Sequence, residues 1–152
     1  MSTVVPDGVE CAPPAPATVA VAGGLQSPSF APAVLVRNRA LLFVSGQVAL
    51  SSTGEVLGSN LAIQSEQAFV SLIRVLTAAQ AGLRDVVQLR VYVVDLTVER
   101  RNTFLAVQHR HLGGHRPAHT LVGVVALARP GLVVELEAIA AVPPASQPPA
   151  WP

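Results

Sequence analysis

Two glutamates spaced two residues apart, Glu135 and Glu137, are the side chains of this sequence best placed for acid–base chemistry. They interrupt its most strand-like run, residues 132–140, which reads Leu-Val-Val-Glu-Leu-Glu-Ala-Ile-Ala. Side chains alternate between the two faces of a strand, so both carboxylates share one face and their apolar neighbours share the other. Because an unpaired carboxylate is costly to bury, the acidic face must meet either water or a site.

Glu135 is the candidate general base or water-orienting acid of such a site, and an ion pair at an interface is the alternative. Glu137 is expected to be mainly structural, paired with Arg90 from a neighbouring strand, and a contact with substrate is the second reading.

His119 and three histidines before it form a second group of candidates. His119 could act as a general acid or base, or donate one hydrogen bond to a carbonyl or carboxylate. His109, His111, His115 and His119 together have a spacing that suggests a metal site. Gly113-Gly114 should end a helix between them, so these side chains are not expected to share a helical face, and no metal site is predicted.

The composition excludes several classes of function. The chain has 152 residues, which suits one domain, and 51% are hydrophobic while only 12% are charged. All ten basic residues are arginines and the net charge is +1, so a nucleic-acid-binding patch is not expected and lysine Schiff-base chemistry is excluded. No apolar run reaches the roughly 20 residues of a membrane span, and no secretory signal begins the chain. We therefore expect a cytoplasmic protein whose apolar surface is partly covered by copies of itself.

A working domain at residues 18–142 is flanked by two tails. Residues 1–17 and 143–152 are rich in proline and small residues and are expected to be extended and flexible. The first tail holds Cys11, the single cysteine, which is therefore not expected to be catalytic.

Hydrophobic periodicity predicts the elements of this domain. A helix is predicted over 61–81, ended by Gly82, and a second over 98–111, capped by Asp95 or Thr97. Apolar runs between turn residues predict strands at 18–22, 33–36 and 40–44 as a hairpin, 86–94, 119–127 and 132–140, the last two joined by a turn at 128–131. This order implies an α+β fold with a mixed sheet and both helices on one face.

Four segments, in this order, resemble the Rid family, the YjgF-type reactive-intermediate deaminases. They read Leu-Leu-Phe-Val-Ser-Gly-Gln at 41–47, Thr-Gly-Glu-Val at 53–56, Asp-Val-Val at 85–87 and Val-Glu-Leu-Glu-Ala-Ile-Ala at 134–140. The resemblance covers about residues 19–142. It implies a chorismate-mutase-like α+β protomer, a homotrimer with a barrel-like core, a small-molecule pocket between neighbouring protomers, and no cofactor.

The resemblance also assigns site residues. The acid that positions the attacking water matches Glu135, and the serine of the Ser-Gly-Gln motif matches Ser45. A pocket asparagine matches Asn102, with local spacing off by one, and a pocket tyrosine matches Phe30, which lacks the hydroxyl. Further substrate contacts are expected at Thr120, Leu121 and Glu137.

One departure from the family motif changes the expected substrate. Typical members clamp the substrate carboxylate with the arginine of a Pro-Ala-Arg-Ser motif, and the matching stretch here reads Pro-Ala-His-Thr at 117–120. A guanidinium has a permanent charge and a bidentate fork, whereas an imidazole has one donor and is mostly neutral near pH 7. Amino-acid-derived imines are therefore expected to bind poorly. His119 is then either a retuned acid–base group or part of the wall of a site that has lost catalysis.

The leading hypothesis is a RidA-like enzyme that acts on a small imine, enamine or related carbonyl compound, in a specialised biosynthetic pathway. Glu135 would activate water or move a proton, and His119 would polarise or protonate the substrate. The alternative is a non-catalytic trimeric protein that senses or carries a metabolite. A ribonuclease, an older label for the family, is disfavoured because the arginines form no basic track.

Overall fold

The computed structural model describes residues 18–25 and 27–144, so Cys11 and most of both tails lie outside the described residues. The elements, in chain order, are β1 Thr18–Val21, β2 Ala33–Val36, β3 Ala40–Gln47, α1 Leu61–Ala78, a 3-10 turn at Leu83–Asp85, β4 Val86–Val94, α2 Val98–Leu112, β5 Ala118–Val124 and β6 Val134–Val142.

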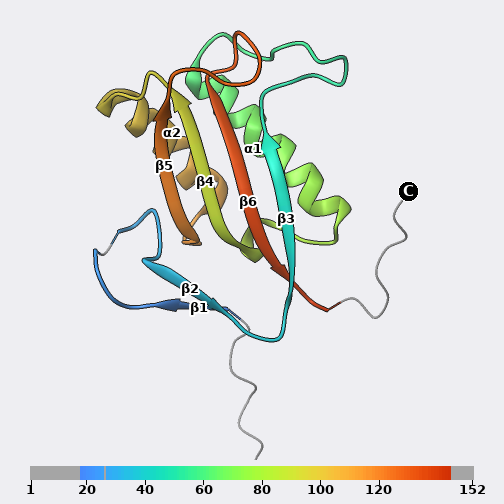
Figure 1. The fold of residues 1–152 in the computed structure, drawn as a ribbon, viewed down its shortest axis with the longest axis vertical. Helices are drawn as coiled ribbons and strands as arrows, with labels where there is room; N and C mark the ends of the chain where they lie inside the picture. The colour runs from blue at the N-terminus through green and yellow to red at the C-terminus, as the bar shows by residue number, and fades with distance from the viewer. Residues whose placement is uncertain (1–17, 26, 145–152) are drawn as a thin grey trace, which may run out of the picture.

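A mixed four-stranded sheet dominates the fold, with the strand order β3-β6-β4-β5. β6 is antiparallel to both of its neighbours, and β5 is parallel to β4. Both helices cover one face of this sheet and leave the other face open (Figure 1). The expected α+β class, with a mixed sheet and two helices on one face, is confirmed.

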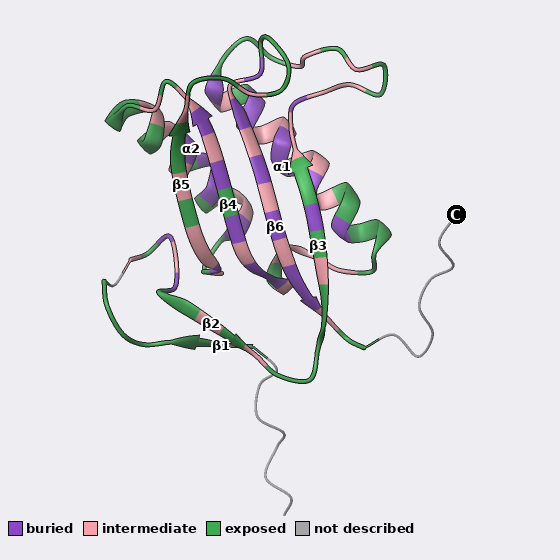
Figure 2. Cartoon of the chain, in the orientation of Figure 1, coloured by how far each residue is buried: buried purple, intermediate pink, exposed green. Residues whose placement is uncertain are grey.

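The hydrophobic core lies between this sheet and the helices. β6 alternates strictly, because Val134, Leu136, Ala138 and Ala140 are at most 2% exposed while the residues between them are half-buried (Figure 2). α1 contributes residues at helical spacing to the same core, and Phe69 from α1 stacks on Phe104 from α2 with ring centroids 6.2 Å apart. Because the even-numbered residues of β6 face the core, the two glutamates between them lie on the opposite face of the strand.

The pairing of β2 differs from the sequence prediction. The strands at 33–36 and 40–47 exist, but β2 pairs with β1 in a separate two-stranded sheet, and β3 pairs with β6. Likewise, β5 and β6 do not pair with each other, because β4 lies between them. Alternating apolar residues indicate that a segment is a strand. The strand with which it pairs is decided by contacts with residues far away in the sequence.

Several predicted ends also move. β6 runs from Val134 to Val142 rather than over 132–140, and β3 continues to Gln47 rather than ending at 44. α1 ends at Ala78 rather than at 81, because Gln80, with φ of 57°, takes the left-handed conformation that was expected of Gly82. β5 ends at Val124 rather than at 127. The cap of α2 is confirmed, since the Thr97 side chain accepts a hydrogen bond from the Arg100 amide.

The side chain of Gln64 on α1 hydrogen-bonds to the segment that leads into β6. Its side chain is 1% exposed, and Nε2 donates to the carbonyl oxygens of Gly58 and Gly131 at 3.1 and 2.8 Å. Its Oε1 accepts from the Val133 amide at 2.8 Å. Three backbone groups, from the segment before α1 and from the segment before β6, thus find their partners on one buried amide.

Gln64→Ala should lower the free energy of unfolding by about 2–4 kcal/mol, because three backbone groups lose their partner inside the protein. Denaturant unfolding at fixed protein concentration measures this loss. Gln67→Ala, on the same helix and without a side-chain hydrogen bond in the described part of the chain, is the matched control. Equal losses in both variants would show that the buried amide has no such role.

Candidate functional site

The two glutamates of β6 lie on the open face of the sheet, and Glu137 is paired there. Arg90 Nη1 donates to Glu137 Oε1 at 2.9 Å, and the Tyr92 hydroxyl donates to Glu137 Oε2 at 2.9 Å. The pair with Arg90 was predicted from the sequence and is confirmed. The Glu137 carboxylate raises the pKa of Tyr92 through this hydrogen bond, so the phenol stays a donor. Glu137, Arg90 and Tyr92 thus form one hydrogen-bonded group on the open face of the sheet.

Glu135, by contrast, has no hydrogen-bond or ion-pair partner among the described residues. Its carboxylate lies directly over Gly46 of β3, where an added Cβ would come within 2.6 Å of the Glu135 Cδ atom. Gly46 sits at a register irregularity between Val44 and Gln47, so the strand is bulged at this point. A glycine inside a strand permits this close approach, and the result is a free carboxylate held against the sheet.

His119 lies on the opposite face of the sheet from Glu135. It is the register partner of Leu89, which is fully buried on the helix side, whereas Glu135 is the partner of Tyr92 on the open side. The His119 ring is largely buried, and its Nε2 atom is fully buried without a partner in the described structure. Burial lowers the pKa of His119 from its ordinary 6.5 to about 4, so the imidazole is neutral at physiological pH.

Phe30 is brought to His119 by an anchored loop. The rings of the two residues lie 6.4 Å apart. Ser29 fixes the loop, because its hydroxyl shares a 2.8 Å hydrogen bond with His109 Nε2 and its carbonyl oxygen accepts from Gln108 Nε2 at 3.0 Å. The amide of the following Ala31 donates to the Pro117 carbonyl oxygen at 3.1 Å. Phe30 therefore lies next to His119.

The other predicted contact residues divide between the two faces. Ser45 is exposed next to Gly46, beside Glu135. Thr120 is exposed on the open face as the register partner of Arg90. Leu121 packs against the core, and Asn102 lies on the exposed surface of α2, where it meets the Arg101 guanidinium at 3.4 Å.

Within one chain, Glu135 and His119 are too far apart to act on one small molecule. β4 separates their strands, which gives roughly 10 Å across the sheet. His119 is level with Leu89, and Leu89 is level with Ala138, so Glu135 is displaced by about 10 Å along the strands as well. Each chain therefore carries two candidate half-sites, one on each face of its sheet.

The other three histidines, His109, His111 and His115, each form a hydrogen bond with a different residue. His109 bonds to Ser29, His111 Nε2 lies 2.6 Å from Glu66 Oε2, and His115 Nε2 lies 2.7 Å from the Val86 carbonyl oxygen. No group of three or more potential metal ligands occurs among the residues that the structure describes.

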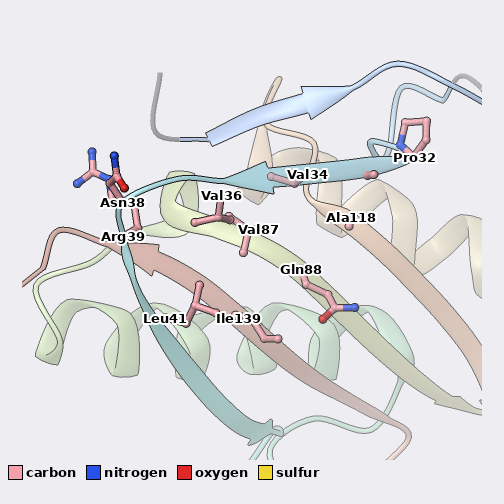
Figure 3. Close-up of a pocket in the computed structure, with 11 residues that line it drawn as sticks. Pro32, Val34, Val36, Asn38, Arg39, Leu41, Val87, Gln88, Ala118 and Ile139 are labelled. Carbon is pink, nitrogen blue, oxygen red and sulfur yellow. The ribbon is translucent and has the colours of Figure 1, made fainter. Parts of the chain in front are cut away.

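None of the predicted site residues lines the larger of two cavities in the described structure. It measures about 550 Å³ and opens between β2 and the open face of the sheet (Figure 3). Val34, Val36, Leu41 and Ile139 line its walls, and Arg39 lies at one end. No carboxylate or imidazole lines it, so this cavity offers no general acid or base.

The residues that hold the candidate side chains in place were not predicted from the sequence. Gly46 could have been found, because a glycine inside an apolar strand signals a close approach. Tyr92 could have been found from its two-residue spacing to Arg90. The pairing of Ser29 with His109 joins segments 80 residues apart, and nothing local signals it.

Comparison with known proteins agrees with this fold. Residues 26–142 match the family model described as Endoribonuclease L-PSP. The mitochondrial protein MMF1 of Saccharomyces cerevisiae is 26% identical over 140 residues, which are 92% of this chain and 86% of MMF1. A RutC family protein of Pyrococcus abyssi is 32% identical over 103 residues, 65% of this chain and 76% of that protein.

Solved structures give the same result. A Rid family protein of unknown function from Yersinia pestis, 32% identical, superposes with a TM-score of 0.76 over 83% of this chain and 99% of its own. A YjgF/YER057c/UK114 family member from Mycobacterium tuberculosis, 34% identical, gives 0.59 over 74% and 86%. The chain belongs to this Endoribonuclease L-PSP family, also called the Rid or YjgF family. Among the residues described, neither helix has the length and apolar character needed to cross a bilayer.

The buried imidazole predicts a pH dependence of stability. Since the pKa of His119 falls from 6.5 to about 4 on folding, the unfolded chain binds more protons between these values. The stabilising effect of neutral His119 is complete above pH 6.5 and is lost as the pH falls to 4. His119→Phe should remove this loss, which amounts to about 2 kcal/mol after allowance for the exposed part of the ring. Denaturant unfolding of both proteins from pH 7 to pH 4 measures it, and parallel profiles would contradict it.

Proposed function

We propose that this protein is a RidA-like enzyme that hydrolyses a small imine or enamine, or catalyses a related acid–base reaction on a carbonyl compound. The observation that carries the proposal is the Glu135 carboxylate, which lies over Gly46 without a partner while the neighbouring Glu137 is fully engaged. Family membership supports a role with small molecules. A specialised biosynthetic pathway is part of the same proposal.

The proposed chemistry is balanced with water alone. Glu135 takes a proton from a water molecule, and the oxygen of that water adds to the carbon of the C=N bond. Glu135 returns this proton to the nitrogen, which gives a carbinolamine. The hydroxyl proton then follows to the nitrogen as the C–N bond breaks, so that an imine and water yield a carbonyl compound and ammonia. His119, being neutral, contributes a hydrogen bond but no charge.

The two half-sites support a pocket formed between copies of the chain. A small substrate can meet both Glu135 and His119 only if these residues come from different copies. The open face of the sheet is suited to association, because it exposes Phe43 and Leu41 to 71% and 48%. A homotrimer with this face turned inward is the assembly that we propose. Solution scattering or light scattering of the intact protein tests it.

The alternative function is a trimeric metabolite-binding protein without catalysis. The burial of His119 Nε2 favours it, because a catalytic imidazole must reach the substrate. Ribonuclease activity has less support, since Arg90 and Arg110 are engaged by Glu137 and Glu66.

Glu135→Gln should lower kcat by 100-fold or more, the usual contribution of a general base being about 10²–10⁴, while the affinity for the product stays the same. Gly46→Ala should lower kcat as well, because its methyl group displaces the carboxylate. Release of ammonia from a panel of imines, with and without a carboxylate, measures this. Glu55→Gln, with the same charge change in an exposed turn, is the control. Full turnover by Glu135→Gln would remove the catalytic role, and ligand binding without turnover in the natural protein would establish the alternative.

His119→Arg should raise kcat/KM for imines that carry a carboxylate by about tenfold or more relative to neutral imines, because a bidentate ion pair is added. The same imine panel measures the ratio, and His119→Gln is the neutral comparison. An unchanged ratio in His119→Arg would show that residue 119 does not face the substrate carboxylate.

A further inference from the structure

The larger cavity, between β2 and the open face of the sheet, has a mostly apolar wall (Figure 3). Asn38, Arg39 and Gln88 are the polar residues that line it, and no carboxylate is among them. Its volume of about 550 Å³ falls within the range of about 300–1,000 Å³ that is typical of binding pockets. An apolar wall of this kind is stabilised when another apolar group covers it.

Strand β6 ends beside this cavity. Its last residue, Val142, is the register partner of Ala40, and Ala141 is the partner of Leu41, which lines the cavity. Arg39, the residue before Ala40, lines one end of the cavity (Figure 3). Because neighbouring strands lie about 5 Å apart, the chain leaves β6 at the rim of the cavity.

The segment that follows β6 has the composition of a ligand for such a cavity. Residues 143–152 read Pro-Pro-Ala-Ser-Gln-Pro-Pro-Ala-Trp-Pro, with no charged side chain, and Trp151 is the single tryptophan of the chain. Prolines restrict the backbone before binding, so less conformational entropy is lost when the segment is ordered. Proline-rich segments dock in apolar grooves for this reason, and an indole buries about 150–250 Å² of surface.

The segment is also long enough to fold back. The cavity wall follows β2 from Pro32 to Val36, which is about 13 Å at 3.3 Å per residue. Residues 144–151 in the extended conformation that prolines favour span about 22 Å, at 3.1 Å per residue. Ala145 and Ser146 do not precede a proline, so the backbone can reverse its direction there.

Gln88 offers a partner for the indole of Trp151. Its side chain lines the cavity and forms no hydrogen bond with the residues that the structure describes (Figure 3). An indole N–H that leaves water needs an acceptor, and the Gln88 amide oxygen is one. The cavity thus combines an apolar wall with a polar group that can orient an indole.

We propose that residues 145–152, which lie outside the described residues, fold back on their own chain and dock in this cavity, with Trp151 as the anchor and Gln88 Oε1 as the acceptor of its indole N–H. The docked segment covers Leu41, which is otherwise 48% exposed, and leaves Phe43, further along β3, for contact between copies of the chain. The inference does not depend on the proposed reaction, because no candidate acid or base lines the cavity.

Tryptophan fluorescence of the full chain tests the proposal, because Trp151 is its only source. Acrylamide should quench this emission at least about twofold less than that of a synthetic peptide of residues 143–152, since a docked indole is reached only when the segment opens. Val36→Gln, which places a polar group in the cavity wall, should restore the quenching of the peptide. Leu35→Gln, the same type of change at the next residue of β2, which does not line the cavity, is the matched control. Gln88→Leu should increase quenching, because the indole loses its acceptor.

The docking is overturned if the natural protein is quenched as readily as the peptide, or if Val36→Gln and Leu35→Gln have the same effect. Unchanged quenching in Gln88→Leu would overturn the hydrogen bond to the indole. Protection of Trp151 that is lost on dilution, together with a fall in the mass measured by light scattering, would show that a second copy covers the indole, and would overturn docking within one chain. Should Val36→Gln fail to fold, Leu41→Gln takes its place, because this wall residue is already 48% exposed.

Discussion

Strand β6 can take only one register, and the rest of the structure depends on it. Its even-numbered residues from Val134 to Ala140 fill the core between β3, β4 and the helices, and a shift by one residue would place Glu135 and Glu137 there instead. Burying two carboxylates in an apolar core costs far more than a domain of this size can lose. The same alternation that builds the core therefore presents both acids on the open face. Arg90 and Tyr92 then engage one of them, and Gly46 gives the other room.

The half-site on the other face has a different origin. His119 lies on the edge strand β5, and Phe30 reaches it only because Ser29 is held by His109 and Gln108 from α2. The register of β5 on β4 fixes the face on which His119 lies, whereas the approach of Phe30 depends on contacts between distant segments. Burial lowers the pKa of His119 and so keeps the imidazole neutral.

Local pattern was enough to predict most of the elements. The two-residue period of β6, the bounds of β4 at Val86–Val94 and the Thr97 cap were all predictable, because each depends on neighbours within a few residues. The pairing of β2 with β1 was not, since a short connection permits several partners and the choice is made by tertiary contacts. The placement of Glu135 and His119 on opposite faces needed the parallel register of β4 and β5, which sequence spacing does not encode.

The two candidate half-sites differ in how strongly they are coupled to the stability of the fold, and this difference affects how ligand specificity can change. Glu135 cannot be moved without disturbing the register of β6, and Gly46 cannot gain a side chain without displacing the carboxylate, so the proposed catalytic half is bound to the stability of the fold. Phe30 and His119 lie on a loop and an edge strand, where substitutions disturb fewer core contacts. Two of the residues at which the sequence departs from the family motif, Phe30 and His119, fall in this second half, and a third, Thr120, lies on the open face. Substitutions near Phe30 and His119 are therefore expected to disturb the fold less than substitutions around Glu135.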